Sequence, residues 1–431
     1  MSLMLFEGAA GTGKTTKLIE SARLHLASHP LQDEQRVLAL TKYHGSRKRM
    51  SEKLMGSKGL AVPVDCMTID SFAWHLLRRW RTLASRFGRM PGNGDFQAIT
   101  ALAGSLLKND HVGAWVSRRY PMVVVDEMQD CSGYELEVLR GLEKHLHVLA
   151  AADAFQDLSG DDNNAAVTWA QSVGKVEVLH RVHRTSVNGL LTAAAALRSR
   201  QSVPILLRPG FEIKSVAAAA LAGWNLSMRI KWWSKFGEIA IISPTRPKKS
   251  AFVRSTVNWV GTQVAKLKKV PHAGPYNIEW EAGDESLKTA ILEALDLPKN
   301  PLKQFECQDL AVIARQNGAS DVYEWLEKQR RVGGRSRVTV AELEEQVGRI
   351  VMQRRAFGSS KALRRIALTA HQAKNREFES VIILWPLSVT PGHEQQRRLL
   401  YNAITRAKRQ AIVLVEDPVG DRLAKPPFTE L

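Results

Sequence analysis

One short segment near the start of the chain constrains the fold more than any other. The apolar run Leu3 to Phe6 is followed by GAAGTGKT, residues 8–15, which matches the pattern GxxxxGK[ST]. In such a loop the glycines let backbone N–H groups wrap phosphates, the lysine reaches the β and γ phosphates, and the hydroxyl can hold Mg²⁺. Because the loop follows a predicted strand and precedes a predicted helix, we expect a nucleoside triphosphate to bind at Gly8, Gly11, Gly13, Lys14 and Thr15.

Short apolar runs alternate with helical patterns along the chain. LMLFEG, RVLALT, MVVVDE and HVLAAAD are typical of buried strands, while SARLHLASH and ELEVLRGLEKHL are typical of the helices between them. A second series of apolar runs begins near Val176 with VEVLH and continues through EIAIISPTR, RIALTA, SVIILWPL and QAIVLVED. This alternation predicts an α/β fold with two tandem domains, each built on a parallel sheet.

Two segments fit neither sheet and are interpreted as insertions. We expect a first domain at 1–84 and 111–175, interrupted by a small helical insertion at 85–110. We expect a second domain at 176–246 and 364–431, interrupted by a basic accessory insertion at 247–363. In that insertion Thr339 and Glu342 form a predicted capping box at the start of a helix.

Charge and composition narrow the class of partner. The chain has 61 Lys+Arg against 43 Asp+Glu, and the segments 239–278 and 347–376 contain no carboxylate at all. Positive charge concentrated in this way favours a nucleic acid over a merely basic surface. No run of about 18 apolar residues occurs, so no membrane span is expected. Three scattered cysteines without a CxxC argue against disulfides and zinc, and favour the cytoplasm.

The segment MVVVDEMQD supplies two candidate catalytic carboxylates. Asp126 and Glu127 follow a predicted strand, so they are expected beside the phosphate loop. Asp126 can bind Mg²⁺ through water, and Glu127 can orient and deprotonate an attacking water. Adjacent acids at a strand end can also be ordinary surface charge, but the loop favours the catalytic interpretation.

DEMQD resembles the DExQD box of the UvrD/Rep family, the superfamily 1A helicases, and further motifs of that family follow in order. The matching stretches are LALTKYHGSRKRMSEKL, TIDSFAWHLLRRW, ADAFQDL, HRVHRTS, TAHQAKNREFESVIIL and LLYNAITRAKRQ. With the phosphate loop included, the matches span Gly8 to Lys408. Apart from the phosphate loop each match is weak alone, and their common order carries the resemblance.

The resemblance implies two RecA-like P-loop NTPase domains with ATP and Mg²⁺ in the cleft between them. It assigns Gln156 to a γ-phosphate sensor, Arg184 and Arg406 to arginine fingers, and Glu377 to nucleotide binding. A single strand would cross both domains, its bases stacking on aromatic side chains. The nucleic-acid candidates are Tyr43, Phe72, Trp74, His371 and Lys374, although Trp74 could equally be a core residue.

Several positions depart from the family pattern. Thr16 stands where the family has a base-stacking arginine, and His183 stands where it has tyrosine. Only seven residues precede Gly8, so we expect the family's upstream adenine-reading glutamine to be missing. Asn375 replaces a glycine, but asparagine tolerates left-handed geometry, so the turn is expected to survive. The sequence therefore predicts an active site that reads the base weakly and accepts NTPs other than ATP.

Three functions compete at this point. The leading hypothesis is an NTP-hydrolysing translocase or helicase on single-stranded DNA, with 3′ to 5′ polarity by family analogy and weak unwinding because the insertions are small. The first alternative is a regulatory subunit of a larger complex, such as a Gabija-type anti-phage system in which a UvrD-like protein accompanies a nuclease. The second alternative, a non-catalytic nucleic-acid-binding module, gives no reason for keeping both carboxylates and both arginines.

Overall fold

The computed structural model describes most of the chain. The described residues are 3–42, 44–56, 59–91, 95–131, 133–158, 164–267, 270–281, 284–298, 300–332, 334–357, 365–389 and 392–429. Within these ranges, none of the helices combines the length and the apolar character that crossing a bilayer would require.

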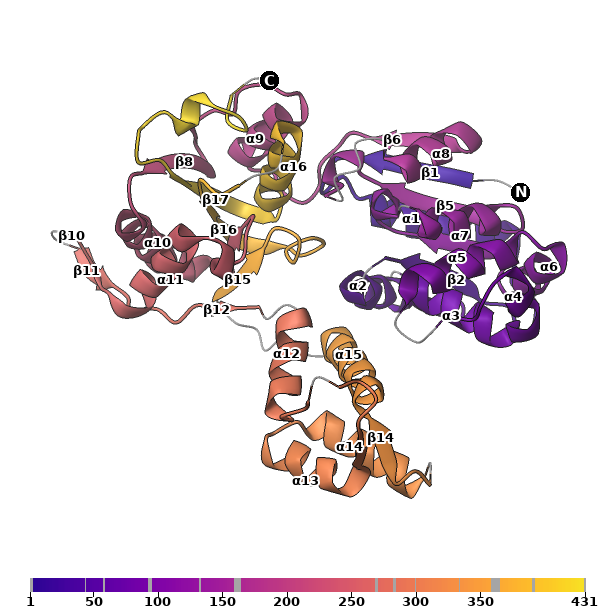
Figure 1. The fold of residues 1–431 in the computed structure, drawn as a ribbon. Helices are drawn as coiled ribbons and strands as arrows, with labels where there is room; N and C mark the ends of the chain where they lie inside the picture. The colour runs from indigo at the N-terminus through magenta and orange to yellow at the C-terminus, as the bar shows by residue number, and fades with distance from the viewer. Residues whose placement is uncertain are drawn as a thin grey trace.

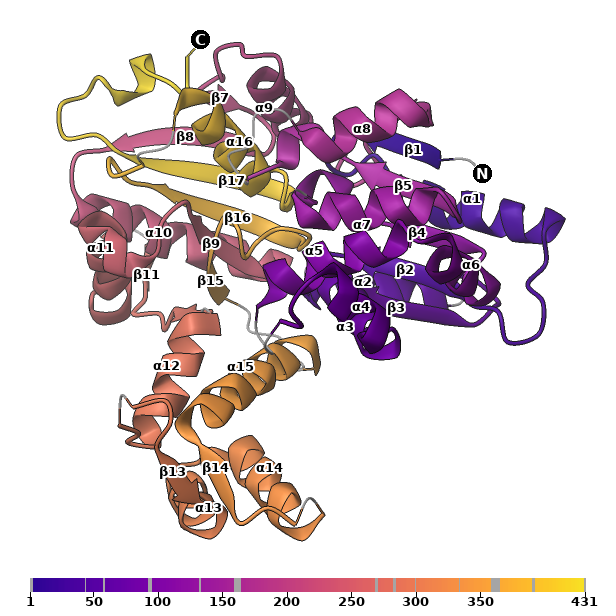
Figure 2. The same cartoon turned by 45° about the vertical axis from the view of Figure 1, so that its right-hand side comes forward.

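The first sheet has six parallel strands in the order β3-β2-β4-β5-β1-β6 (Figures 1 and 2). The strands are β1 (Leu3–Gly8), β2 (Val37–Thr41), β3 (Val64–Thr68), β4 (Met122–Val125), β5 (His147–Ala152) and β6 (Lys175–Leu179). The central strands are continuous apolar runs, as expected of a parallel sheet covered on both faces. Because parallel strands end at one edge of the sheet, the segments that follow β1, β4 and β5 lie together there.

Helices cover both faces of this sheet. They are α1 (Lys14–Ser28), α2 (His44–Met55), α3 (Ile69–Arg79), α4 (Arg81–Phe87), α5 (Phe96–Leu107), α6 (Asp110–Arg119), α7 (Tyr134–Glu143) and α8 (Ala165–Val173), with short 3-10 turns η1 (Met128–Asp130) and η2 (Ala154–Gln156). The predicted insertion at 85–110 is helical, and Asp95 caps α5 by accepting the Ala98 N–H at 3.1 Å. Helix α5 packs on α3 and α7, so this segment contributes to the core of the first domain.

The second sheet has seven strands in the order β12-β15-β9-β16-β17-β8-β7, and β7 runs antiparallel to β8. The strands are β7 (Leu206–Leu207), β8 (Phe211–Val216), β9 (Ile239–Ser243), β12 (Glu279–Trp280), β15 (Arg365–Thr369), β16 (Phe378–Trp385) and β17 (Ala407–Glu416). The helices of this domain are α9 (Asn188–Arg198), α10 (Ala219–Trp233), α11 (Ala251–Thr262) and α16 (His393–Ile404). It also contains the 3-10 turns η3 (Ser234–Phe236), η4 (Pro247–Lys249) and η5 (Arg422–Ala424). Strands β10 (Ala265–Leu267) and β11 (Val270–Ala273) form a separate hairpin. Two α/β domains are therefore present in tandem.

The expectation that VEVLH opens the second sheet is wrong. Strand β6 pairs in parallel with β1, with Phe6 opposite Glu177 and Gly8 opposite Leu179. An apolar run has the same appearance at the end of one sheet and at the start of the next, so the sequence could not decide between them.

The predicted insertion at 247–363 divides into two parts. Helix α11 packs with α10, and β12 pairs with β15, so the part up to Trp280 belongs to the second domain. The remainder is a separate helical body with its own core, which Figures 1 and 2 show projecting away from both sheets. It contains α12 (Asp284–Ala294), β13 (Gln304–Glu306), α13 (Cys307–Gln316), α14 (Ser320–Arg331), β14 (Arg337–Thr339) and α15 (Val340–Phe357).

The sequence analysis predicted a basic insertion, but this accessory body, residues 284–357, is not basic. It carries as many lysines and arginines as aspartates and glutamates, because the acid-free stretches lie mainly on either side of it. The predicted capping box is confirmed: the Thr339 N–H donates to Glu342 Oε2 at 2.9 Å, and the Glu342 N–H donates to Thr339 Oγ1 at 3.2 Å. Helix α15 of this body contacts α2 of the first domain.

Candidate nucleotide site

The phosphate loop connects β1 to α1 at the carboxyl edge of the first sheet. Gly11 and Gly13 have φ values of 79° and 83°, which glycine adopts without strain. A side chain at Gly11 would also collide with Arg184, whose Cβ would lie 2.6 Å from the added Cβ. Lys14 is buried, and its Nζ donates to the carbonyls of Gly8 at 2.9 Å and Ala9 at 3.0 Å. The lysine therefore extends along the concave side of the loop, where phosphates would bind.

Asp126 and Glu127 follow β4 and lie next to this loop. The Thr15 hydroxyl donates to Asp126 Oδ2 at 3.1 Å, so two oxygen ligands of the kind that Mg²⁺ prefers are adjacent. Among the described residues no cluster of three or more His, Cys, Asp or Glu could hold a metal ion. One carboxylate and one hydroxyl nevertheless fit Mg²⁺, since this ion usually takes its other ligands from phosphates and water.

Glu127 is held in an unusual conformation by its surroundings. Its φ of 56° is in the left-handed region, which is uncommon outside glycine and is found at functional sites. Gln129 Nε2 donates to Glu127 Oε2 at 2.6 Å. Burial alone would raise the pKa of Glu127, but Lys14 and the Gln129 hydrogen bond outweigh it and lower that pKa. Burial and the neighbouring Glu127 raise the pKa of Asp126 to about 6.

The two predicted arginine fingers lie beside this site: Arg406 follows α16 of the second domain, and Arg184 belongs to the segment that connects β6 to α9. The Arg184 N–H donates to the Gly11 carbonyl at 3.3 Å, and its side chain bonds Glu377 Oε1 at 2.9 Å and the Thr405 carbonyl at 2.9 Å. Arg406 is almost completely buried, and its Nε donates to the Asn402 carbonyl at 3.0 Å. Burial, and then the like charge of Arg184, lower the pKa of Arg406 to about 9. A cation that is shielded from water in this way would interact strongly with the negative charge of a nearby phosphate.

Gln156, the predicted γ-phosphate sensor, lies where the domains meet. It ends η2 and is buried, and its carbonyl accepts from Asn402 Nδ2 of α16 at 3.4 Å. Asn375 has a φ of 61°, so asparagine does support the left-handed turn that the family builds with glycine.

The predicted base-reading positions offer few directed groups. Thr16 is exposed, and the His183 side chain is exposed although its N–H donates to the Gly11 carbonyl at 2.7 Å. The His183 ring lies beside Gly13, since a Cβ there would be 3.6 Å from His183 Cδ2. Lys17 is paired with Glu177 at 3.1 Å.

The predicted nucleic-acid residues are less well supported. Phe72 is buried in the core of the first domain, so its assignment as a stacking platform is wrong: the apolar face of α3 turns it inward. Trp74 is half-buried and packs against the same core. His371 is exposed. Lys374 forms an ion pair with Asp130 at 2.5 Å, in which both side chains are largely buried, so its ammonium group does not face a nucleic-acid strand. Tyr43 lies outside the described residues.

Gln129 and Asp130, within DEMQD itself, are site residues that the sequence analysis missed. Gln129 is buried and bonds Glu127, while its Oε1 accepts the Asp153 N–H at 3.0 Å. The resemblance drew attention to the first two carboxylates of DEMQD, but the sequence gives no sign that the second polar pair, Gln129 and Asp130, faces inward.

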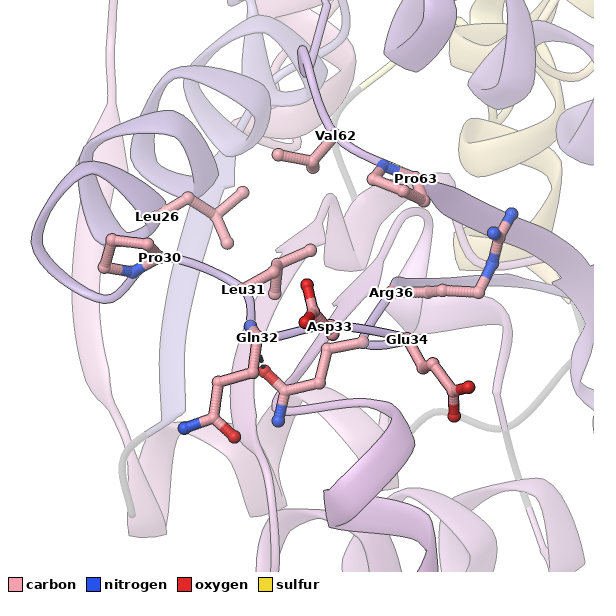
Figure 3. Close-up of a pocket in the computed structure, with 10 residues that line it drawn as sticks. Leu26, Pro30, Leu31, Gln32, Asp33, Glu34, Arg36, Val62 and Pro63 are labelled. Carbon is pink, nitrogen blue, oxygen red and sulfur yellow. Dashed lines mark hydrogen bonds between the residues drawn. The ribbon is translucent and has the colours of Figure 1, made fainter.

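One surface pocket lies away from this site. It has a volume of about 420 Å³ and lies between the end of α1, the loop before β2, and Pro63 before β3. Figure 3 shows the residues that line it. The pocket therefore lies at the amino ends of β2 and β3, whereas the phosphate loop follows the carboxyl end of β1.

Two family models match the chain. Residues 366–414 match the UvrD-like helicase C-terminal domain, and residues 1–161 match an AAA domain. The two matches fall on the two α/β domains, and the AAA match agrees with a RecA-like P-loop NTPase fold. No curated protein is similar enough in sequence to count as a match.

Proposed function

We propose, on the premise that both family matches support a UvrD/Rep-like helicase, that this chain is an NTP-driven translocase on single-stranded DNA. The matches themselves support a helicase or NTPase function. The proposal adds that the protein moves along single-stranded DNA in the 3′ to 5′ direction. It also adds that the hydrolysed nucleotide is usually ATP with Mg²⁺, and that other NTPs are accepted.

One observation carries the proposal: the segment that bears Arg184 is bonded directly to the phosphate loop. The N–H groups of His183 and Arg184 both donate to the Gly11 carbonyl, at 2.7 and 3.3 Å. The side chain of Arg184 in turn bonds Glu377 Oε1 and the Thr405 carbonyl of the second domain, each at 2.9 Å. A movement of the second domain relative to the phosphate loop therefore acts on this guanidinium, and a link of this kind is what coupling hydrolysis to translocation requires.

The proposed chemistry assigns each described group one task. Lys14 and the loop amides bind the phosphates, and Thr15 with Asp126 would hold Mg²⁺, which neutralises charge on the phosphoryl oxygens. Glu127, kept ionised at neutral pH by Lys14 and Gln129, accepts the proton of the attacking water. Arg184 and Arg406 stabilise the charge that develops on the transferred group.

Steady-state hydrolysis with and without single-stranded DNA tests this function. We expect single-stranded DNA to stimulate turnover, Lys14→Ala to abolish it, and Lys144→Ala, which changes an exposed lysine away from the site, to leave it unchanged. Turnover that is insensitive to single-stranded DNA, or that survives Lys14→Ala, would contradict the proposal.

A second function has one specific observation in its favour. Edge strand β6 leaves Val176 and Val178 about half exposed, which is the kind of apolar edge that a protein partner can cover. On this alternative the chain is a regulatory NTPase in a larger complex, for example with a nuclease. Negligible hydrolysis by the isolated protein, restored by a co-purifying partner, would favour it.

A further inference from the structure

Tyr401 is a second-domain residue whose hydroxyl contacts the phosphate loop of the first domain. It belongs to α16 and is 1% exposed. Its hydroxyl accepts the N–H of Ala10, in the phosphate loop, at 2.9 Å and donates to Asp153 Oδ2 at 3.2 Å. One hydroxyl thus connects α16 to two segments of the first domain.

Asp153 and Arg198 complete the surroundings of this hydroxyl. The Asp153 side chain is fully buried, and Arg198 Nη1, from α9 of the second domain, lies 2.6 Å from its Oδ1 and 3.3 Å from the Tyr401 hydroxyl. The Tyr401 ring packs edge-on against the Phe155 ring, with the two ring centroids 5.0 Å apart. A buried carboxylate needs a cation, so Asp153 retains this partner only while the two domains are in contact.

The same aspartate is connected to the predicted general base. The Asp153 N–H donates to Gln129 Oε1 at 3.0 Å, and Gln129 Nε2 donates to Glu127 Oε2 at 2.6 Å. Gln129 is buried, so its amide has few alternative partners. Contacts from the second domain therefore run to the phosphate loop through Tyr401 and to Glu127 through Asp153 and Gln129.

We propose that Tyr401, Asp153 and Arg198 form a positioning relay, which sets the phosphate loop and Glu127 in their working geometry only when the two domains are closed. The inference rests on the proposed NTPase function and assigns no direct contact with substrate to these three residues. Opening of the domains removes the hydroxyl from Ala10 and the guanidinium from Asp153, so the base loses its support and hydrolysis in the open form is suppressed.

Tyr401→Phe tests the relay, because it deletes the hydroxyl and keeps the ring against Phe155. We expect kcat of single-strand-stimulated hydrolysis to fall about three- to tenfold, the effect of one hydrogen bond, with KM for the nucleotide and the melting temperature little changed. Arg198→Ala should lower kcat further, Arg198→Lys should restore part of it, and the losses of Tyr401→Phe and Arg198→Ala should not add.

The chain contains a matched control in Tyr120. Its hydroxyl donates to Asp65 at 2.7 Å, and Asp65 is also bonded by Arg36 and Arg119, so the group has the same chemistry but lies at the amino end of the first sheet. Tyr120→Phe should leave kcat unchanged. Equal losses in both variants, or a kcat for Tyr401→Phe within about twofold of the wild type, would overturn the relay.

A second readout does not depend on hydrolysis. Fluorescence transfer between labels at Lys144→Cys and Lys235→Cys, exposed positions on different domains, reports domain closure in a Cys66→Ser background. Tyr401→Phe should shift the distribution toward the open form, and an unchanged distribution would contradict the relay. A wild type that does not hydrolyse NTP refutes the proposed function alone, whereas an active wild type with an indifferent Tyr401→Phe variant refutes the relay alone.

Discussion

Lys374 Nζ lies 2.5 Å from Asp130 Oδ1, and both side chains are almost completely withdrawn from solvent. The pair joins the loop after β15 of the second domain to the loop after β4 of the first. Burial raises the pKa of Asp130 to about 6, although Lys374 opposes the shift. The carboxylate is therefore charged at neutral pH but close to taking up a proton, which would remove the ion pair between the domains.

This pair gives a pH-dependent prediction. Because the pKa of Asp130 is higher in the folded protein than in the unfolded chain, its contribution to stability is fully present below about pH 4 and is lost as the pH rises through about 6. The melting temperature of the wild type should thus rise relative to Asp130→Asn when the pH is lowered from 7 to 5. Asp65→Asn is the control, since the pKa of Asp65 is lowered and its contribution stays constant over that range. A difference between wild type and Asp130→Asn that does not change with pH would show that Asp130 titrates normally.

Glu127→Gln should separate nucleotide binding from turnover. The amide keeps the size of the side chain but cannot accept the proton of the attacking water, so kcat should fall by about 10²–10⁴-fold while nucleotide affinity remains. Binding of a fluorescent nucleotide and steady-state hydrolysis measure the two effects. Glu20→Gln, on the exposed face of α1, is the control. Turnover of Glu127→Gln near the wild-type rate would show that another group is the base.

Base selectivity should be weak. Thr16 is exposed, Lys17 is engaged with Glu177, and the His183 ring can stack on any purine without distinguishing them. A site without hydrogen bonds to a substrate group cannot strongly reject an analogue that lacks it. We expect kcat/KM for ATP and GTP to agree within about tenfold, or about 1.4 kcal/mol. Hydrolysis of ATP, GTP, CTP and UTP with saturating single-stranded DNA measures this, and a preference for ATP above about a hundredfold would reveal a base-reading group.

The salt dependence of binding should locate the nucleic-acid surface. Each phosphate contact contributes a slope of about −0.7 in a plot of log affinity against log salt for single strands. Lys248, Lys249 and Arg254 are exposed on η4 and α11 of the second domain, so reversing their charges should flatten the slope. Lys268 and Lys269 belong to the same acid-free stretch but lie outside the described residues. As the control, we expect charge reversal at Lys144 and Lys175, two exposed lysines of the first domain, to have little effect on the slope. Equal slopes for the second-domain variant and this control would show that the basic stretch does not bind nucleic acid.

Strand separation by the isolated protein should be poor. The accessory body spans only residues 284–357 and has no excess of positive charge with which to hold a duplex. We therefore expect strong stimulation of hydrolysis by single strands with little displacement of long duplexes, measured with a fluorescently labelled fork. Processive unwinding in that assay would contradict this prediction.

The sequence predicted the general fold because each of its signals was local. The phosphate loop, the apolar strands, the Thr339 capping box and the left-handed Asn375 all depend on neighbours within a few residues. What it missed depended on tertiary contacts. The sheet to which β6 belongs, the burial of Phe72 and the ion pair of Lys374 are decided by which distant segment packs against them. A basic stretch was also mistaken for a basic domain, because charge along the chain does not show where the chain folds back.

The position of β6 has a mechanical consequence. The chain leaves the first domain from a strand hydrogen-bonded alongside β1, and four residues after Leu179 the backbone of His183 is fastened to Gly11 of the phosphate loop. The segment that connects the domains is therefore short and firmly attached where it passes the phosphate loop. A flexible connection would absorb a small displacement of the phosphate loop, but a stiff connection transmits it to the second domain. Inserting a few glycines after Ser186, between this anchored segment and α9, should leave both domains folded and NTP hydrolysis intact, while the movement along single-stranded DNA that we propose is lost in a translocation assay.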